Sequence, residues 1–193
     1  MGEEFRIVGY VMDKAGTVDE IQYDKLTHIN YAFLIPNDDG TVRPLHSPRK
    51  LARLIASAHE HGVQVLLSIG GWGCDGPFEA LAADPVSRAK LVEEVVKQVE
   101  KHGFDGADMD WEYPDPGDSA WNFLALMQEL SAAMHSRGKL ATAAVVALGP
   151  NAESILPEVF DCVDFLNIMA YDGPGENHSP YSYAEEALDY WRG

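Results

Sequence analysis

The sequence predicts an α/β protein, a parallel sheet with helices packed outside it. Short apolar, strand-like runs alternate with amphipathic helical segments along the 193 residues, which is the pattern of repeated βα units. The run at residues 63–69 is apolar almost throughout, as expected for a strand covered on both faces. No change in composition marks a linker, so one domain over residues 1–193 is expected. A doubly wound sheet and a (β/α)8 barrel both satisfy this pattern.

The first third of the chain is expected to hold two strands and two helices. The strands are the apolar runs at 6–12 and 28–34, and the helices span 19–26 and 48–61. Asp19 is expected to cap the first helix. Ser47 is a good N-cap for the second, with Pro48 in the first helical position. Apolar residues then recur at helical spacing until Gly62, which ends the helix.

The middle of the chain continues the alternation with a strand at 63–69, a helix and a strand within 104–114. Asp84 and Pro85 open the helix and Gly103 closes it. Its buried stripe is expected to consist of Leu91, Val95, Val96 and Val99.

The last third is expected to hold two strands and three helices. The expected ranges are a helix at 119–136, a strand at 140–148, a short helix at 151–160 interrupted by Pro157, a strand at 163–171 and a helix at 183–191. Six strands are counted in all.

Composition narrows the function classes. The net charge of −17 argues against nucleic acid, whose phosphates would be repelled. No apolar run approaches the roughly 20 residues of a membrane span. Cys74 and Cys162 fall at opposite ends of predicted strands, so two free thiols are expected. The seven histidines show no metal-ligand spacing, and no phosphate-binding loop is present, so no metal and no cofactor is expected.

Three acidic residues share one face of the strand within 104–114. Because side chains alternate along a strand, Asp108, Asp110 and Glu112 point one way, with neighbours roughly 6.5–7 Å apart along the backbone. Close carboxylates resist ionising together, and general acid catalysis needs a proton held in this way. A hydrated strand edge or an oxygen-ligand metal site are the plainer alternatives. Asp105 has the opposite parity and is interpreted as structural.

The run Asp105-Gly-x-Asp108-x-Asp110-Trp-Glu112-Tyr-Pro resembles the signature of family 18 glycoside hydrolases, the chitinases. Weaker family marks stand at residues 68–72 and 169–172. The resemblance implies a TIM (β/α)8-type barrel, whose active site lies at the carboxyl ends of the strands. This chain supplies about six βα units, so the barrel is expected to be C-terminally incomplete, with the last two strands missing. The first and sixth strands would then be open edges.

The resemblance also implies the reaction: substrate-assisted, retaining hydrolysis of β-1,4-linked N-acetylglucosamine polymers, chitin or chitooligosaccharides. Glu112 would be the acid and later the base. Asp110 would orient the 2-acetamido group, and Asp108 would share a proton with Asp110. Tyr171 would donate its hydroxyl to the acetamido oxygen.

Further residues are implied as substrate-binding or supporting, namely Tyr10, Phe33, Ser68, Gly71, Trp72, Tyr113, Met169 and Asp172. Tyr10 and Ser68 resemble family hydroxyls that hydrogen-bond to Asp108, although a place in the core is as common. Trp72 follows a Gly-Gly pair and is expected to stack on a sugar ring, with Phe33 a weaker candidate for the same cleft. Met169 on a strand is more often plain packing.

Other interpretations stay open at this point. An endo-β-N-acetylglucosaminidase shares the motif, although Tyr113 and the following proline favour a chitinase. A non-catalytic, chitinase-like carbohydrate-binding protein usually lacks the acid that Glu112 supplies here. Because the last two strands are absent, two more interpretations stay open: an inactive fragment, and a barrel that a second chain completes. The parent protein is expected to be secreted; no signal peptide precedes Phe5, which leaves a cytoplasmic chain open.

Overall fold

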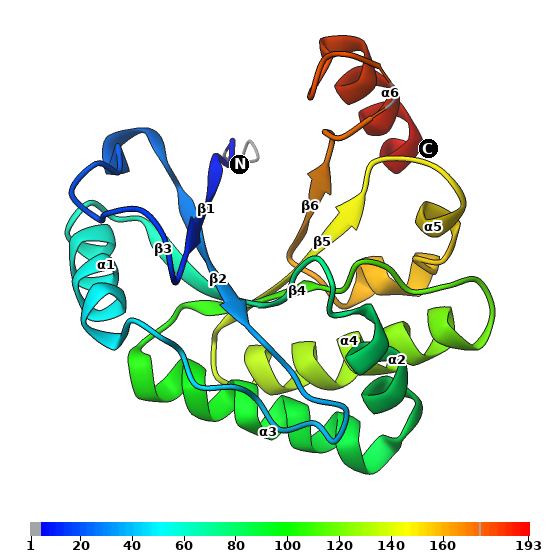
Figure 1. Cartoon of the computed structure of the whole chain (residues 1–193), viewed down its shortest axis with the longest axis horizontal. Coiled ribbons are helices and arrows are strands. Elements are labelled where there is room, and N and C mark those ends of the chain that lie inside the picture. Colours follow the sequence, from blue (N-terminus) through cyan, green and yellow to red (C-terminus); the bar gives the residue numbers. More distant parts are fainter. Residues whose placement is uncertain (1–4, 174) are drawn as a thin grey trace.

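The computed structural model describes residues 5–173 and 175–193, which fold as a curled, open sheet with helices on its outer face (Figure 1). Within these residues all neighbouring strands are parallel and lie in chain order: β1 (Val8–Met12), β2 (His28–Leu34), β3 (Gln64–Gly70), β4 (Gly106–Asp110), β5 (Leu140–Val146) and β6 (Phe165–Met169). This arrangement confirms the incomplete barrel, with β1 and β6 as its edges.

The helices of the described residues mostly follow the expected order. They are α1 (Pro48–Glu60), α2 (Asp75–Ala83), α3 (Pro85–His102), α4 (Asp118–His135), α5 (Pro150–Glu153) and α6 (Tyr181–Arg192), with 3-10 turns η1 (Tyr23–Lys25) and η2 (Pro157–Asp161). Helices α1, α3 and α4 lie along the convex side of the sheet (Figure 1). No helix of residues 5–173 and 175–193 is long and apolar enough to cross a bilayer.

The core lies between the convex face of the sheet and these helices. Alternate strand residues point outward into it, and those of β2 to β5 include Ile29, Tyr31, Val65, Leu67, Ala107, Met109, Ala141 and Ala143, all fully buried. The other parity lines the concave face and is unusually polar, with Asn30, Ser68, Asp108, Asp110 and Thr142 all buried there. The fold thus sets polar groups on the inside of the curl.

Several expected elements are confirmed at the residue level. Strand β2 has the predicted bounds. Helix α3 begins after Asp84, whose carboxylate accepts hydrogen bonds from the backbone N–H groups of Val86 and Ser87, and ends at Gly103 in the left-handed conformation (φ 80°). Both cysteines are free and buried.

Three local predictions are wrong. Asp19 caps no helix: only the turn η1 forms, and the Asp19 carboxylate instead pairs with the guanidinium of Arg53 at 2.6 Å. The side chain of Ser47 makes no capping hydrogen bond to α1. Its backbone N–H donates to the buried carboxylate of Asp13 (3.0 Å). Helix α2, which follows β3, was not expected at all.

Candidate active site

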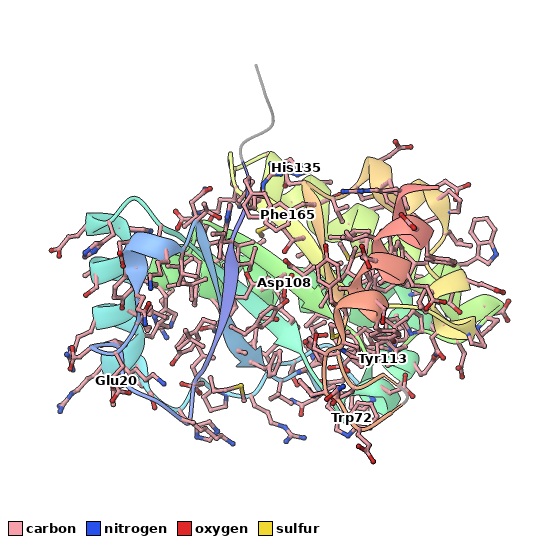
Figure 2. All side chains as sticks on the ribbon, turned by 90° about the horizontal axis from the view of Figure 1, so that it is seen from above. Glu20, Trp72, Asp108, Tyr113, His135 and Phe165 are labelled. Carbon is pink, nitrogen blue, oxygen red and sulfur yellow. The ribbon has the colours of Figure 1, made fainter. Side chains whose placement is uncertain are left out.

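The acidic motif lies at the carboxyl end of β4, in the middle of the open sheet. Asp108 is in register with Ser68 of β3 and Thr142 of β5. Asp110 is the last residue of β4, and Glu112 lies two residues beyond the strand. In Figure 2 Asp108 lies between two ends of the molecule, with Trp72 and Tyr113 toward one end and Phe165 and His135 at the other. The motif therefore leads from the interior of the curl to its rim.

Asp108 is fully buried and accepts four side-chain hydrogen bonds. Its Oδ2 atom accepts from the hydroxyls of Tyr10 (2.9 Å) and Ser68 (2.8 Å). Its Oδ1 atom accepts from Thr142 Oγ1 (2.6 Å) and Asn167 Nδ2 (3.0 Å). Burial raises the pKa of Asp108, whereas these donors favour its ionised form. Four strands other than β4 thus converge on one carboxyl group, and the expected contacts from Tyr10 and Ser68 are both present.

Asp110 sits in a different environment although it is only two residues away. It is 3% exposed, and its Oδ1 atom is buried without a hydrogen-bond partner among the described residues. Burial first, then the charge of Asp108 and then that of Glu112, raise its pKa to about 8. At neutral pH Asp110 therefore keeps a proton between two other acids.

Glu112 is half-buried at the rim of the curl. Burial raises the pKa of its carboxyl group, the hydrogen bond with the Tyr113 side chain lowers it, and the charge of Asp172 raises it. The pKa of Tyr113 is raised in turn, by burial and then by Glu112. A carboxyl group with a raised pKa at an accessible rim is suited to donate a proton.

A glycine pair brings the β3 end close to this rim. Gly70 and Gly71 have φ values of 107° and 85°, and a side chain on Gly70 would lie 2.3 Å from the backbone oxygen of Asp110. The backbone N–H of Gly71 donates to that same oxygen (2.8 Å). Trp72 follows and is 82% exposed, which leaves its indole face open.

The Phe33 ring packs against Gly71, the residue directly before Trp72. A side chain on Gly71 would meet the Phe33 ring at 2.7 Å. Phe33 also lines a hollow of about 430 Å³ with Met12, Arg43 and His46. The structure groups it with the β1–β2 side of the rim.

The motif at residues 169–172 lies on the β6 side of the rim. Tyr10, Met169 and Tyr171 line a hollow of about 490 Å³ between the two edge strands. Asp172 has a φ of 53°, and its carboxylate contacts His178 Nδ1 at 2.8 Å, while the His178 ring stacks on Tyr171 at 5.5 Å. Met169 is buried beside these groups, so all three predicted residues gather here.

The sequence reasoning missed two residues of the site, Thr142 and Asn167. Each is a polar residue within an otherwise apolar run, on the parity that faces the curl. The single polar residue in each apolar strand was the signal in the sequence that could have identified them. Asp105, by contrast, is structural as expected: its Oδ2 atom accepts from His59 of α1 and from the backbone N–H of Val65.

Comparison with known proteins agrees with this geometry. A family model described as glycosyl hydrolases family 18 matches residues 6–192. The chain is 34% identical over 168 residues to a probable endochitinase of Caenorhabditis elegans, covering 76% of this chain and 27% of that protein. It is 32% identical over 174 residues to a class V chitinase of Arabidopsis thaliana, covering 82% of this chain and 46% of the other.

Solved structures give the same result. A chitinase from Bacteroides thetaiotaomicron superposes with a TM-score of 0.86 at 25% identity, over 97% of this chain and 62% of that one. A mutant of Ostrinia furnacalis Group II chitinase catalytic domain 2, in complex with penta-N-acetylchitooctaose, gives 0.85 at 25% identity, over 97% and 60%. The chain thus spans less than two thirds of each of these relatives, and it belongs to the glycosyl hydrolases of family 18.

Proposed function

We propose that the protein hydrolyses β-1,4-linked N-acetylglucosamine polymers, chitin or chitooligosaccharides, and that residues 1–193 form one catalytic-type domain. The observation that carries this is the line of three acids from Asp108 through Asp110 to Glu112, rising from the buried interior to the rim. The relatives named chitinases, and the one solved with penta-N-acetylchitooctaose, support the substrate class.

In the first step the carbonyl oxygen of the substrate's 2-acetamido group attacks the anomeric carbon of its own ring. The bond from that carbon to the glycosidic oxygen breaks, and Glu112 gives its proton to the departing oxygen. The result is a cyclic oxazolinium-type intermediate and an ionised Glu112. The raised pKa of Glu112 supports this role, because the acid must still be protonated when substrate arrives.

In the second step a water molecule attacks the anomeric carbon from the face that the leaving group vacated. Glu112 takes a proton from that water, the oxazolinium ring opens and the acetamido group is restored. Two displacements at one carbon give net retention of configuration. Glu112 ends the cycle protonated, as it began.

Asp110 and Tyr171 position the acetamido group in this scheme. The unpartnered Oδ1 atom of Asp110 is available to accept the acetamido N–H, which aims the carbonyl oxygen at the anomeric carbon. The Tyr171 hydroxyl donates to that carbonyl oxygen. Asp108, held in place by its donors Tyr10, Ser68, Thr142 and Asn167, lies beneath Asp110 and shares a proton with it.

The exposed groups at the rim bind the rest of the sugar chain. Trp72 offers a flat apolar face to a pyranose ring on the leaving-group side. At Gly71 the absence of a side chain lets the backbone come close to the sugar. Asp172 and Tyr113 supply polar contacts to the sugar, Met169 lines the wall of the site, and Phe33 lies behind its β2 side.

Release of fluorophore from chitobiose and chitotriose glycosides tests the proposal. Wild type should turn over, Glu112→Gln should lose activity by at least about a hundredfold, and Glu153→Gln, an exposed acid on α5, should match wild type. Oligosaccharide binding without turnover in wild type would instead favour a carbohydrate-binding protein. Absence of both binding and turnover would refute the proposal.

A further inference from the structure

The residue next to the proposed acid is locked into the helix layer. Trp111 is 1% exposed. Its ring stacks on Phe78 of α2 (5.2 Å between centroids, 14° between planes) and meets Phe123 of α4 edge-on at 5.9 Å. Glu112 follows Trp111 directly in the chain, beyond the end of β4, so a Trp111 ring fixed among the helices restrains the backbone from which the Glu112 side chain projects.

The polar edge of the Trp111 ring is held as firmly as its faces. Indole Nε1 donates a hydrogen bond to Asp75 Oδ1 at 2.9 Å. A buried indole N–H needs such an acceptor. Asp75 is the first residue of α2, where a carboxylate is also favoured by the helix dipole.

The far end of the same segment is tied to α2 as well. Glu79 lies one turn after Asp75, on the same face of the helix. Its carboxylate accepts from the hydroxyl of Ser119, which is buried. Ser119 Oγ in turn accepts from the backbone N–H of Asp115 at 3.0 Å. Two carboxylates on one helix face therefore reach both ends of residues 111–119, the segment that carries Glu112 and Tyr113.

We propose that Asp75 and Glu79 are positioning residues for the acid: helix α2 braces residues 111–119 at both ends and so fixes the direction of Glu112 at the rim. The inference rests on the proposed hydrolase function and adds residues to it. Asp75 acts through the ring of Trp111, and Glu79 acts through the hydroxyl of Ser119. Neither touches the substrate in this scheme.

Turnover of a fluorogenic chitotriose glycoside tests the brace at Asp75. Asp75→Ala should lower kcat by about ten- to a hundredfold with KM within about twofold, since a misplacement of about 1 Å has that effect. Asp75→Asn should restore most of kcat, because its amide oxygen accepts the same N–H. The control Glu153→Ala, an acid in the first turn of α5, should match wild type.

A double-variant comparison separates positioning from plain loss of a charge. Trp111→Phe keeps the stacked ring and removes the N–H, so it should lower kcat as Asp75→Ala does. Adding Asp75→Ala to Trp111→Phe should then lower kcat little further, because the hydrogen bond is already gone. Additive losses, or a wild-type kcat in Asp75→Ala, would overturn the inference while leaving the hydrolase function intact.

Amide hydrogen exchange provides the readout at Glu79 and needs no turnover. Glu79→Ala should speed exchange of the Asp115 amide by at least about tenfold, Glu79→Gln should leave it near wild type, and amides of α3 should not change. If wild type proved inactive, the proposed function would fail on its own, and amide exchange would still test whether Glu79, through Ser119, holds the Asp115 end of the segment. An Asp115 amide that exchanges alike in wild type and Glu79→Ala would overturn it.

Discussion

Replacing Asp110 with asparagine should change how the stability of the protein depends on pH. The native carboxyl group keeps its proton up to about pH 8, whereas an unfolded chain releases it near the ordinary value of about 4. Between these values the native state binds more protons than the unfolded state, so the free energy of unfolding falls as pH rises. The asparagine amide of the variant cannot titrate, and this contribution disappears.

The size of the effect follows from the same values. Each pH unit between the two pKa values changes the free energy of unfolding by about 1.4 kcal/mol per extra bound proton. From pH 5 to pH 8 the free energy of unfolding of wild type should therefore fall by about 3–4 kcal/mol relative to that of Asp110→Asn. Burial is the largest cause, followed by the charges of Asp108 and Glu112.

Urea unfolding followed by tryptophan fluorescence, at pH 5, 6, 7 and 8, measures this difference. Asp189→Asn, an exposed acid on α6, should run parallel to wild type over the whole range. A wild-type curve that also stays parallel to that of Asp110→Asn would refute the reasoning, because Asp110 would then be ionised in the native protein at neutral pH.

Three further changes should have separable effects. Asp108→Ala leaves two fully buried hydroxyl donors without an acceptor, so urea unfolding should show a loss of about 2–6 kcal/mol; a loss below about 1 kcal/mol would contradict this. Gly70→Ala places a Cβ 2.3 Å from a backbone oxygen, whereas at Gly73, also with positive φ, nothing lies within 4 Å. Gly70→Ala should therefore cost about 2 kcal/mol more than Gly73→Ala, and equal losses would count against the close approach. Trp72→Ala should leave stability within about 0.5 kcal/mol, since the side chain is 82% exposed, and raise KM for a chitotriose glycoside about three- to tenfold; an unchanged KM would remove the stacking role.

Much of the fold was predictable because its signals are local. Strand β2 and the start of α3 follow from an apolar run and from an Asp-Pro capping pair. Helix α2 was missed because Gly76 and Pro77, which usually mark loops, stand in its first turn. A proline is tolerated there, since its missing N–H would have no partner inside the helix.

The candidate site was predictable in part, and the limit is physical. Alternation placed Asp108 and Asp110 on one face, but strand β4 ends at Asp110, so the position of Glu112 depends on packing beyond the strand. The contacts of Thr142 and Asn167 with Asp108 join residues 34 and 59 positions apart. Only the register of the folded sheet brings such residues together.

Proton NMR of the first product formed from chitotetraose tests the central claim most directly, because it observes the configuration of the carbon that reacts. Attack by the substrate's own amide, with Glu112 as acid and then base, predicts that the β-anomer appears first and only later mutarotates to the equilibrium mixture. First appearance of the α-anomer would contradict the account.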